Sequence, residues 1–166
     1  MKTKTIWTIC LLFLGSSLAI QAQDTPFKDF LKQPLVKTSF ITKPMLDLAK
    51  DTEVGNITIG DLANRLEQVE TYSNVRTGSQ RYLATGMKRM ATEQVERNNY
   101  NLILSLTEGN KVITFYSKTP EGEKEIISDL IMMSYIPDNM VGQFSLIRLT
   151  GRLTFDDLRR IHPVKK

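Results

Sequence analysis

Four runs of apolar, β-branched and aromatic residues dominate the second half of the chain, between Asn99 and Thr150. The runs cover residues 99–106, 111–117, 125–135 and 140–150. The segments that separate them are short and rich in turn-forming residues: Glu108-Gly109-Asn110, Thr119-Pro120-Glu121-Gly122 and Pro137-Asp138-Asn139. Loops this short can join only neighbouring antiparallel strands. The pattern therefore predicts a four-stranded antiparallel meander.

The alternation of residues along two of these runs predicts which side chains share a face of the sheet, because successive side chains of a strand point to opposite sides. In the first run one face carries Tyr100, Leu102, Leu104 and Leu106. In the third run one face carries Ile127, Ile131, Met133 and Tyr135 together with Asp129. Neither run has a purely polar face, so part of both faces is expected to be covered. We expect helices over one face, and a partner, a ligand or the N-terminal segment against the other.

Further strands and helices are predicted on either side of the meander. Strands are expected near residues 35–41 and 67–73, and the longest helix over about residues 79–97. One stripe of that helix is apolar at helical spacing: Ala84, Met87, Ala91 and Val95. A last helix is expected after Thr154, which serves as its N-cap.

These elements predict one α+β domain with two layers. Its mainly antiparallel sheet would consist of the C-terminal four-stranded meander and two N-terminal strands, with helices chiefly on one face. A ferredoxin-like core extended by extra strands is the favoured version of this fold.

The first residues have the layout of a secretory signal peptide. A basic start, Met1-Lys2-Thr3-Lys4, precedes an apolar stretch from Ile6 to Leu14, and small residues follow. Cleavage is expected after Ala22 or after Ala19, and we divide the chain into a signal peptide, residues 1–22, and a single domain, residues 23–166. An uncleaved membrane anchor is the competing interpretation, but the apolar stretch is shorter than the roughly 20 residues of a spanning helix.

Removal of this segment changes the chemistry of the chain. It takes away Cys10, the only cysteine, and with it any disulfide, thiolate nucleophile or cysteine-based metal site. It also takes away two of the 22 Lys and Arg residues and none of the 18 acidic residues, so the net charge falls from +4 to +2. Cys10 lies inside the apolar stretch and is not preceded by small residues. We therefore expect an exported protein that is not a lipoprotein.

Several features together resemble a known bacterial family. They are a Phe-x-x-Phe near the mature N-terminus, a strand leading into Thr42-Lys43-Pro44-Met45-Leu46, the strand–turn–strand block, and the closing stretch from Leu149 to Leu158. This pattern is similar to the envelope family catalogued as domain of unknown function 4252. The resemblance implies a Gram-negative source and export, and it supplies no catalytic residues. Many similar proteins look lipid-anchored, whereas this chain lacks a usable lipid-attachment motif.

A search for catalytic and metal-binding patterns finds none that the fold does not already explain. His162 is the only histidine, and the acidic pair Asp156-Asp157 is expected to stabilise a helix start. Neither a Gly-x-Ser-x-Gly elbow nor a calcium-binding Asp-x-Asp-x-Asp-Gly loop is present. We therefore predict no catalytic residues, no metal site and no cofactor.

The weak ligand-binding candidates are a helix start and two tyrosines. Ser79 and Arg81 could bind a small anion at the start of the long helix, although the interpretation of Ser79 as a helix cap is favoured. Tyr100 and Tyr116 could line a ligand pocket between sheet and helices. Basic residues along the helices would suit anionic lipid headgroups better than nucleic acid, because glutamates lie among them and export removes the usual nucleic-acid partner.

The leading expectation is a non-enzymatic envelope protein, periplasmic or associated with the outer membrane, that binds another protein or acts in envelope maintenance or stress signalling. The alternative is a carrier of a small apolar or anionic ligand held between sheet and helices. A hydrolase using serine and His162 is the third hypothesis. The identity of the partner and the oligomeric state stay open.

Overall fold

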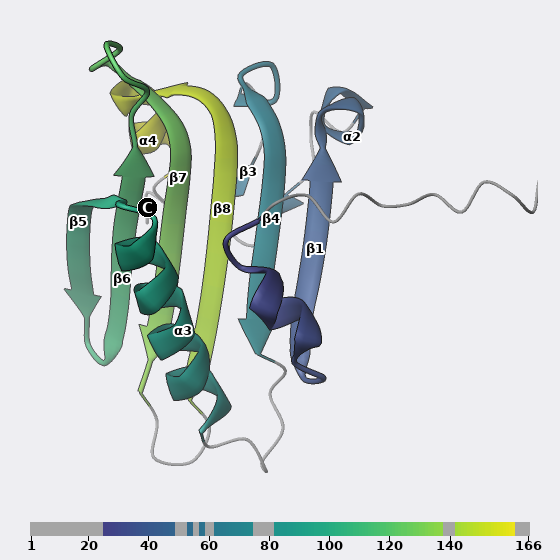
Figure 1. The fold of residues 1–166 in the computed structure, drawn as a ribbon, viewed down its shortest axis with the longest axis vertical. Coiled ribbons are helices and arrows are strands. Elements are labelled where there is room, and N and C mark those ends of the chain that lie inside the picture. Colours follow the sequence, from purple (N-terminus) through teal and green to yellow (C-terminus); the bar gives the residue numbers. More distant parts are fainter. Residues whose placement is uncertain are drawn as a thin grey trace, which may run out of the picture.

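The computed structural model describes residues 25–48, 53–54, 57–58, 62–74, 82–137 and 142–161, with the side chains of 159–161 left aside. The predicted signal peptide, Ser79, Arg81 and His162 lie outside the described residues. A six-stranded sheet in which all neighbouring pairs are antiparallel forms the centre of the fold (Figure 1). Its strand order is β1-β4-β8-β7-β6-β5. The strands are β1 (Val36–Thr42), β4 (Leu66–Asn74), β5 (Asn101–Glu108), β6 (Lys111–Lys118), β7 (Ile126–Ile136) and β8 (Gln143–Thr154).

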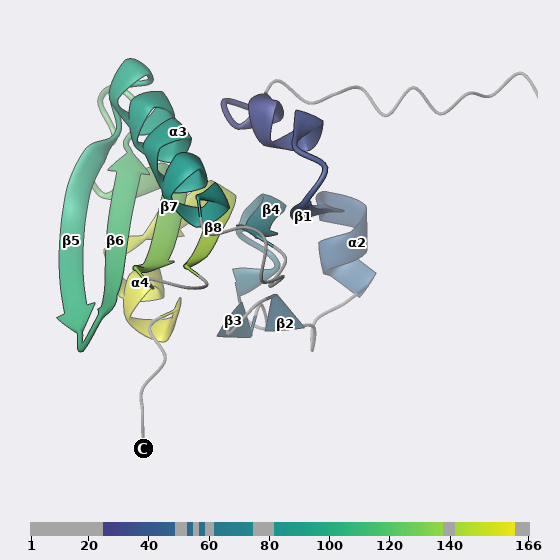
Figure 2. The same ribbon diagram turned by 90° about the horizontal axis from the view of Figure 1, so that it is seen from below.

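Helices lie on both faces of this sheet, but the larger layer covers one of them (Figure 2). The first face carries the 3₁₀-helix η1 (Lys28–Lys32) and the long helix α3 (Leu83–Arg97). The second face carries α2 (Lys43–Leu48) and α4 (Phe155–Ile161), both at one end, near the small hairpin of β2 (Glu53–Val54) and β3 (Ile57–Thr58). The predicted α+β class, with a mainly antiparallel sheet, is therefore confirmed.

The predicted order of strands is confirmed in part. The four meander strands, β5 to β8, lie side by side in chain order, and both N-terminal strands join the same sheet next to β8. A ferredoxin-like core would contain two β-α-β crossovers. Here α3 joins β4 to β5 across the three strands that lie between them, whereas β1 and β4 are direct antiparallel neighbours. The sheet therefore does not have the ferredoxin-like order.

A β-bulge in β5 changes the faces that simple alternation predicts. The register shifts between Leu102 and Leu104, so that Leu102 lies opposite Tyr116 and Leu104 lies opposite Phe115. Tyr116 packs with the first-face core and Phe115 with the second-face core. The expectation that Leu102 and Leu104 share a face is therefore wrong, because an extra residue in one strand reverses the direction of the side chains that follow.

A second bulge, in β7, has the same consequence. The register shifts between Ile127 and Asp129, and Ile127 lies opposite Leu153 in the second-face core. Ile131 and Met133, by contrast, belong to the first-face core. Alternation assigned all of these residues to one face, so the assignment of Ile127 is wrong.

The first-face core is aromatic where η1 meets the sheet. Phe27 and Phe30 are each about 1% exposed. The centre of the Phe30 ring lies 5.3 Å from that of Tyr72 and 6.3 Å from that of Phe144, with edge-on geometry in both pairs. Next to this cluster, the predicted stripe of α3 is buried against the sheet: Ala84, Met87, Ala91 and Val95. This face is therefore covered by two separate elements that bury apolar side chains.

The core of the second face is covered by helices at one end and continues along the sheet to Ile147 and Phe115, which are 6% and 5% exposed. Apolar side chains of α2, of the segment before β4 and of α4 pack on the strands at the covered end: Leu46, Leu62, Ala63 and Leu158. Gly151 lets β8 pass close to the main chain before β4, because a Cβ atom at this position would lie 2.1 Å from the Arg65 carbonyl oxygen. The Arg152 amide donates to that same oxygen at 2.9 Å.

The start of α4 follows the predicted cap. The Thr154 amide and hydroxyl donate to the Asp157 carboxylate at 2.8 and 2.9 Å, and the Asp157 amide donates back to the Thr154 hydroxyl at 3.4 Å. Arg65 adds a cationic partner for Asp157, at 2.7 Å. Burial alone would raise the pKa of Asp157, but the hydrogen bonds from Thr154 and Arg65 outweigh it and lower that pKa.

Candidate functional site

The register of the sheet arranges the second face in three rows that run across the strands. One row is apolar over four strands and lies under α2 and α4; we call it the closed row, and it contains Ile41, Val69, Leu149 and Leu130. The next is the middle row, which contains Ser39, Thr71, Ile147, Met132, Phe115 and Leu104. The last is the serine row, which contains Lys37, Ser73, Ser145, Ser134, Ile113 and Leu106. We refer to the middle and serine rows together as the open end.

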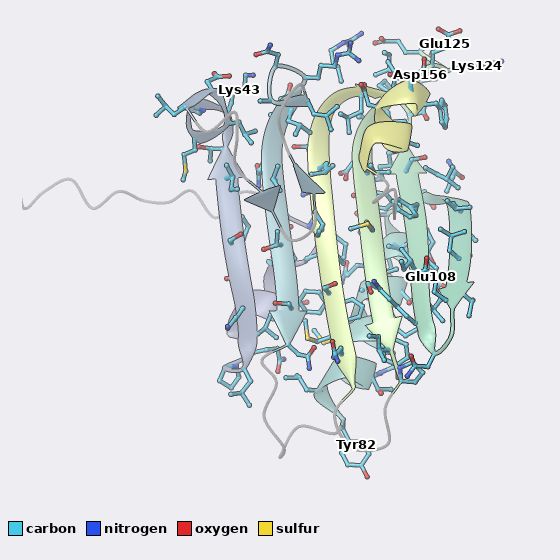
Figure 3. The ribbon with its side chains drawn as sticks, turned by 180° about the vertical axis from the view of Figure 1, so that it is seen from behind. Lys43, Tyr82, Glu108, Lys124, Glu125 and Asp156 are labelled. Atoms are coloured by element: carbon cyan, nitrogen blue, oxygen red, sulfur yellow. The ribbon has the colours of Figure 1, made fainter. Side chains whose placement is uncertain are left out.

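The open end has no helix over it in the part of the chain that the structure describes (Figure 3). In this view α4 and the β2–β3 hairpin lie at the upper end of the face, and Glu108 marks the β5 side. Three serines of the serine row are only half-buried, and Leu104 of the middle row is 40% exposed. A sheet face that has no helix over it and exposes apolar and hydroxyl side chains is a surface on which another molecule can pack.

The chemistry of the open end changes from one side of the sheet to the other. On β1 and β4 it presents hydroxyl groups, and Ser39 and Thr71 hydrogen-bond to each other at 2.9 Å. On β7, β6 and β5 it presents apolar side chains, including Met132, Ile113 and Leu104. A partner on this face would therefore meet an apolar strip beside a strip of hydroxyl groups.

A shallow cavity of about 240 Å³ opens where the serine row reaches the margin of the sheet. Its polar lining consists of Ser73, Asn74, Lys111, Ser134, Gln143 and Ser145. The Asn74 side chain ties two strands together at this margin, since its amide donates to the Gly142 carbonyl and its oxygen accepts from the Phe144 amide. The cavity lies at the margin of the open end, and no helix residue is among the described residues that line it.

The first face contains a different polar group, a buried ion cluster centred on Arg148. Its guanidinium donates to Glu70 at 2.7 Å and to Asp129 at 2.6 Å, from one strand to its two neighbours. Glu70 also accepts hydrogen bonds from Thr25, Gln68 and Tyr72. The Glu70 residue is 1% exposed and the Arg148 side chain 13%. Each charge has a partner, which is the condition under which charges are tolerated in a protein interior.

The tyrosines of this cluster are held in their neutral form. Burial raises the pKa of Tyr100, and the neighbouring Asp129 carboxylate, which accepts a hydrogen bond from the Tyr100 hydroxyl at 2.7 Å, raises it further. Burial likewise raises the pKa of Tyr72, with Glu70 acting in the same direction. The Lys118 ammonium lies 4.4 Å from the centre of the Tyr100 ring. These groups stabilise one another and leave neither tyrosine poised as a nucleophile or base near neutral pH.

Of the residues proposed from sequence, the two tyrosines are described and both lie on the first face of the sheet, whereas Ser79 and Arg81 lie outside the described residues. Tyr100 lies in the ion cluster, and Tyr116 packs at the border of the first-face core. Two cavities among the described residues, the one above and a smaller one between η1 and α3, are lined by other side chains. The alignment of Ser73, Ser145 and Ser134 escaped sequence reasoning, because it depends on strand register and not on spacing along the chain.

Two kinds of feature, a metal-binding cluster and a membrane-spanning helix, are absent from the described residues. These residues contain no cluster of three or more His, Cys, Asp or Glu side chains that could hold a metal ion. None of the helices in the described part of the chain is long and apolar enough to cross a membrane.

Comparison with known proteins identifies a family but no named relative. No curated protein and no solved structure matches the chain. The family described as Domain of unknown function (DUF4252) matches residues 30–161, which extend from η1 to the end of α4 and include both the open end and the ion cluster. The chain therefore belongs to the DUF4252 family.

Proposed function

We propose that this protein is an exported bacterial envelope protein that binds another protein through the open end of its sheet. The observation that carries the proposal is the contrast within one face: the closed row lies under α2 and α4, whereas the middle and serine rows continue the same face with no described helix over them.

The composition of the open end supports a protein partner. Apolar side chains of Met132, Ile113 and Leu104 lie next to one another on three adjacent strands, with hydroxyl groups beside them. Protein interfaces combine an apolar centre with polar groups that form hydrogen bonds at the rim. A flat surface of this kind suits another folded surface better than a small molecule, which needs a concave site.

A binding role is favoured over catalysis by the state of the ionisable groups. Arg148 forms ion pairs with both Glu70 and Asp129, and the two tyrosines in contact with them have raised pKa values. An enzyme usually keeps at least one such group unpaired and poised near the working pH. The protein is therefore proposed to act without catalysis.

The envelope location is supported by the signal-like pattern of residues 1–22 and by the net charge of +2 that remains after their removal. An anionic membrane surface stays a second partner for the basic side chains. A carrier of an apolar ligand is less well supported, because Tyr100 and Phe115 are both packed in the cores and not against a cavity.

The β5 bulge offers a matched pair of variants to test the proposal. Leu104→Glu places a charge on the open end, and Leu102→Glu places the same charge two residues away on the opposite face. Both leucines are well exposed, at 40% and 58%, so neither change should unfold the protein. Tagged wild-type and variant proteins would be recovered from the native envelope, and captured proteins identified by mass spectrometry.

We expect one captured protein to be lost with Leu104→Glu and kept with Leu102→Glu. Mixing that purified protein with each variant should reproduce the difference, with at least a tenfold weaker dissociation constant for Leu104→Glu, since desolvating a charge in an interface costs more than about 1.4 kcal/mol. Equal capture by both variants would count against the open end as the binding surface.

A further inference from the structure

The cavity at the margin of the open end contains an arrangement of donors that suits a small anion. We propose that the pocket formed by Lys111 and the three serines Ser73, Ser145 and Ser134 binds a small carboxylate or phosphate. This inference does not depend on a protein partner, and its test uses small anions alone.

The charge of the lining indicates the sign of the ligand. Lys111 contributes a cation, and neither Asp nor Glu is among the described residues that line the cavity. No ion pair of Lys111 is present within the described ranges, although Glu108 faces it across the β5–β6 turn. Lys111 is the one charged side chain among the described residues that line the cavity, so the pocket carries a positive charge that an anion can neutralise.

The serines are placed so that their hydroxyl groups converge on one ligand. Ser73, Ser145 and Ser134 are direct neighbours in register on β4, β8 and β7, and they point to the same face. Adjacent strands lie about 4.8 Å apart, so hydroxyl groups of two neighbouring serines can donate to different oxygens of one carboxylate or phosphate. Each of these three hydroxyl groups can donate one hydrogen bond, and none of them has a described residue as its hydrogen-bond partner.

The wall of the pocket is already fixed by the fold. Asn74 uses both ends of its side-chain amide to join the end of β4 to the start of β8, at 2.9 and 2.8 Å. Two of the serines stand on these joined strands, next to Asn74 and Phe144 in the chain. A site whose donors are held before the ligand arrives loses less entropy on binding.

The size and remaining surface of the cavity limit the class of ligand. A volume of about 240 Å³ is below the roughly 300–1,000 Å³ of sites for drug-sized molecules, so the ligand should have few non-hydrogen atoms. Ile136 and Phe144 complete the lining with apolar surface. The pocket therefore suits an anionic group that carries, at most, a short apolar chain.

The proposal can be tested by NMR titration of ¹⁵N-labelled protein at constant pH and ionic strength. The probes are inorganic phosphate, butyrate, and butyramide as the uncharged counterpart of butyrate. We expect saturable shifts of the amides of Ser73, Ser134 and Ser145 with at least one of the two anions, and no saturation with butyramide. The anion whose chemical-shift changes saturate will show whether the ligand belongs to the phosphate or to the carboxylate class.

Two lysine variants separate this pocket from general surface charge. Lys111→Gln removes the ammonium group of the pocket and should raise the dissociation constant of the anion at least about tenfold. Lys37→Gln removes the ammonium group of the serine row on β1, which lies outside the cavity. It should change the dissociation constant of the anion by no more than about twofold. The ¹⁵N spectrum of each variant without ligand is the folding control. A spectrum that matches that of the wild-type protein, apart from residues next to the substitution, will show that the variant is folded.

Three results would overturn the proposal: shifts that do not saturate with either anion, equal binding of butyramide and butyrate, or equal weakening by Lys37→Gln and Lys111→Gln. None of them bears on the Leu104 experiment, in which the protein partner is the readout.

Discussion

The closed row and the serine row lie on the same face of the same sheet, yet they are built differently. In the closed row, Val69, Leu149 and Leu130 are each 3% exposed or less, under side chains of α2 and α4. In the serine row, the corresponding strands carry Ser73, Ser145 and Ser134, all half-buried. The difference teaches that the chain places large apolar residues where it supplies its own cover, and small hydroxyl residues where it does not.

This contrast separates stability from recognition. Burial at the closed row contributes to the free energy of unfolding. The hydroxyl groups and the exposed leucine of the open end contribute little to it, and in our account they serve an external molecule. Substitutions at the two ends should therefore have effects of different size on stability.

The largest effect is expected from shortening a closed-row leucine. Leu149→Ala removes buried methyl groups between Val69 and Leu130 and should lower the free energy of unfolding by about 2–5 kcal/mol. The matched change Leu104→Ala, on the open end, should cost less than about 1 kcal/mol. Urea denaturation followed by circular dichroism measures both; equal losses would remove the distinction between the ends.

A smaller loss of stability is expected from a substitution at Gly151, where β8 passes the segment before β4. Gly151→Ala would place a methyl group 2.1 Å from the Arg65 carbonyl oxygen, at a residue whose φ is +153°. The strained conformation alone should cost about 1–3 kcal/mol, and displacing the backbone adds to it. Gly122→Ala, in an open turn with φ +83° and no atom near the new methyl group, measures the conformational part separately. A stability of Gly151→Ala equal to that of Gly122→Ala would show that the two segments are not in contact.

The helix cap that holds α4 over the closed row should give a pH-dependent effect. Asp157→Ala should cost about 1 kcal/mol near neutral pH, through loss of the hydrogen bonds with Thr154. Because the folded state lowers the pKa of Asp157 below its ordinary value, this contribution is present above that ordinary value, near pH 4, and is lost as the pH falls through the folded pKa. Unfolding curves of both proteins between pH 7 and pH 2 should therefore converge in acid; a constant difference would contradict the assignment.

The smallest change in the free energy of unfolding is expected from a substitution in the serine row. Ser145→Ala removes one half-buried hydroxyl group that has no partner among the described residues, and should change the free energy of unfolding by no more than about 0.5 kcal/mol. Thermal melts with a resolution of one degree are sufficient to measure this. A loss above 2 kcal/mol would mean that the serine row is part of the core.

Local patterns were enough to predict most elements of this fold. The apolar runs between Asn99 and Thr150 gave the meander, the stripe that includes Met87 and Val95 gave the buried side of α3, and Thr154 gave the start of α4. Each of these signals lies within a few residues of sequence, where periodicity and capping rules apply.

Long-range register was not predictable in the same way. Arg148 and Glu70 are 78 residues apart and meet only because β4 and β8 pair in one alignment. The bulge between Leu102 and Leu104 leaves no mark in the pattern of apolar residues, yet it decides which leucine belongs to the open end. The rows of the second face follow from these alignments, so the candidate site became visible only in three dimensions.

Site-specific photocrosslinking from β5 tests the central claim most directly. A photoreactive residue would be placed at position 104 or position 102, and the native envelope illuminated with the protein in place. The account predicts a discrete crosslinked species from position 104, on the open end, and none from position 102 on the opposite face. The same species from both positions, or from position 102 alone, would contradict it.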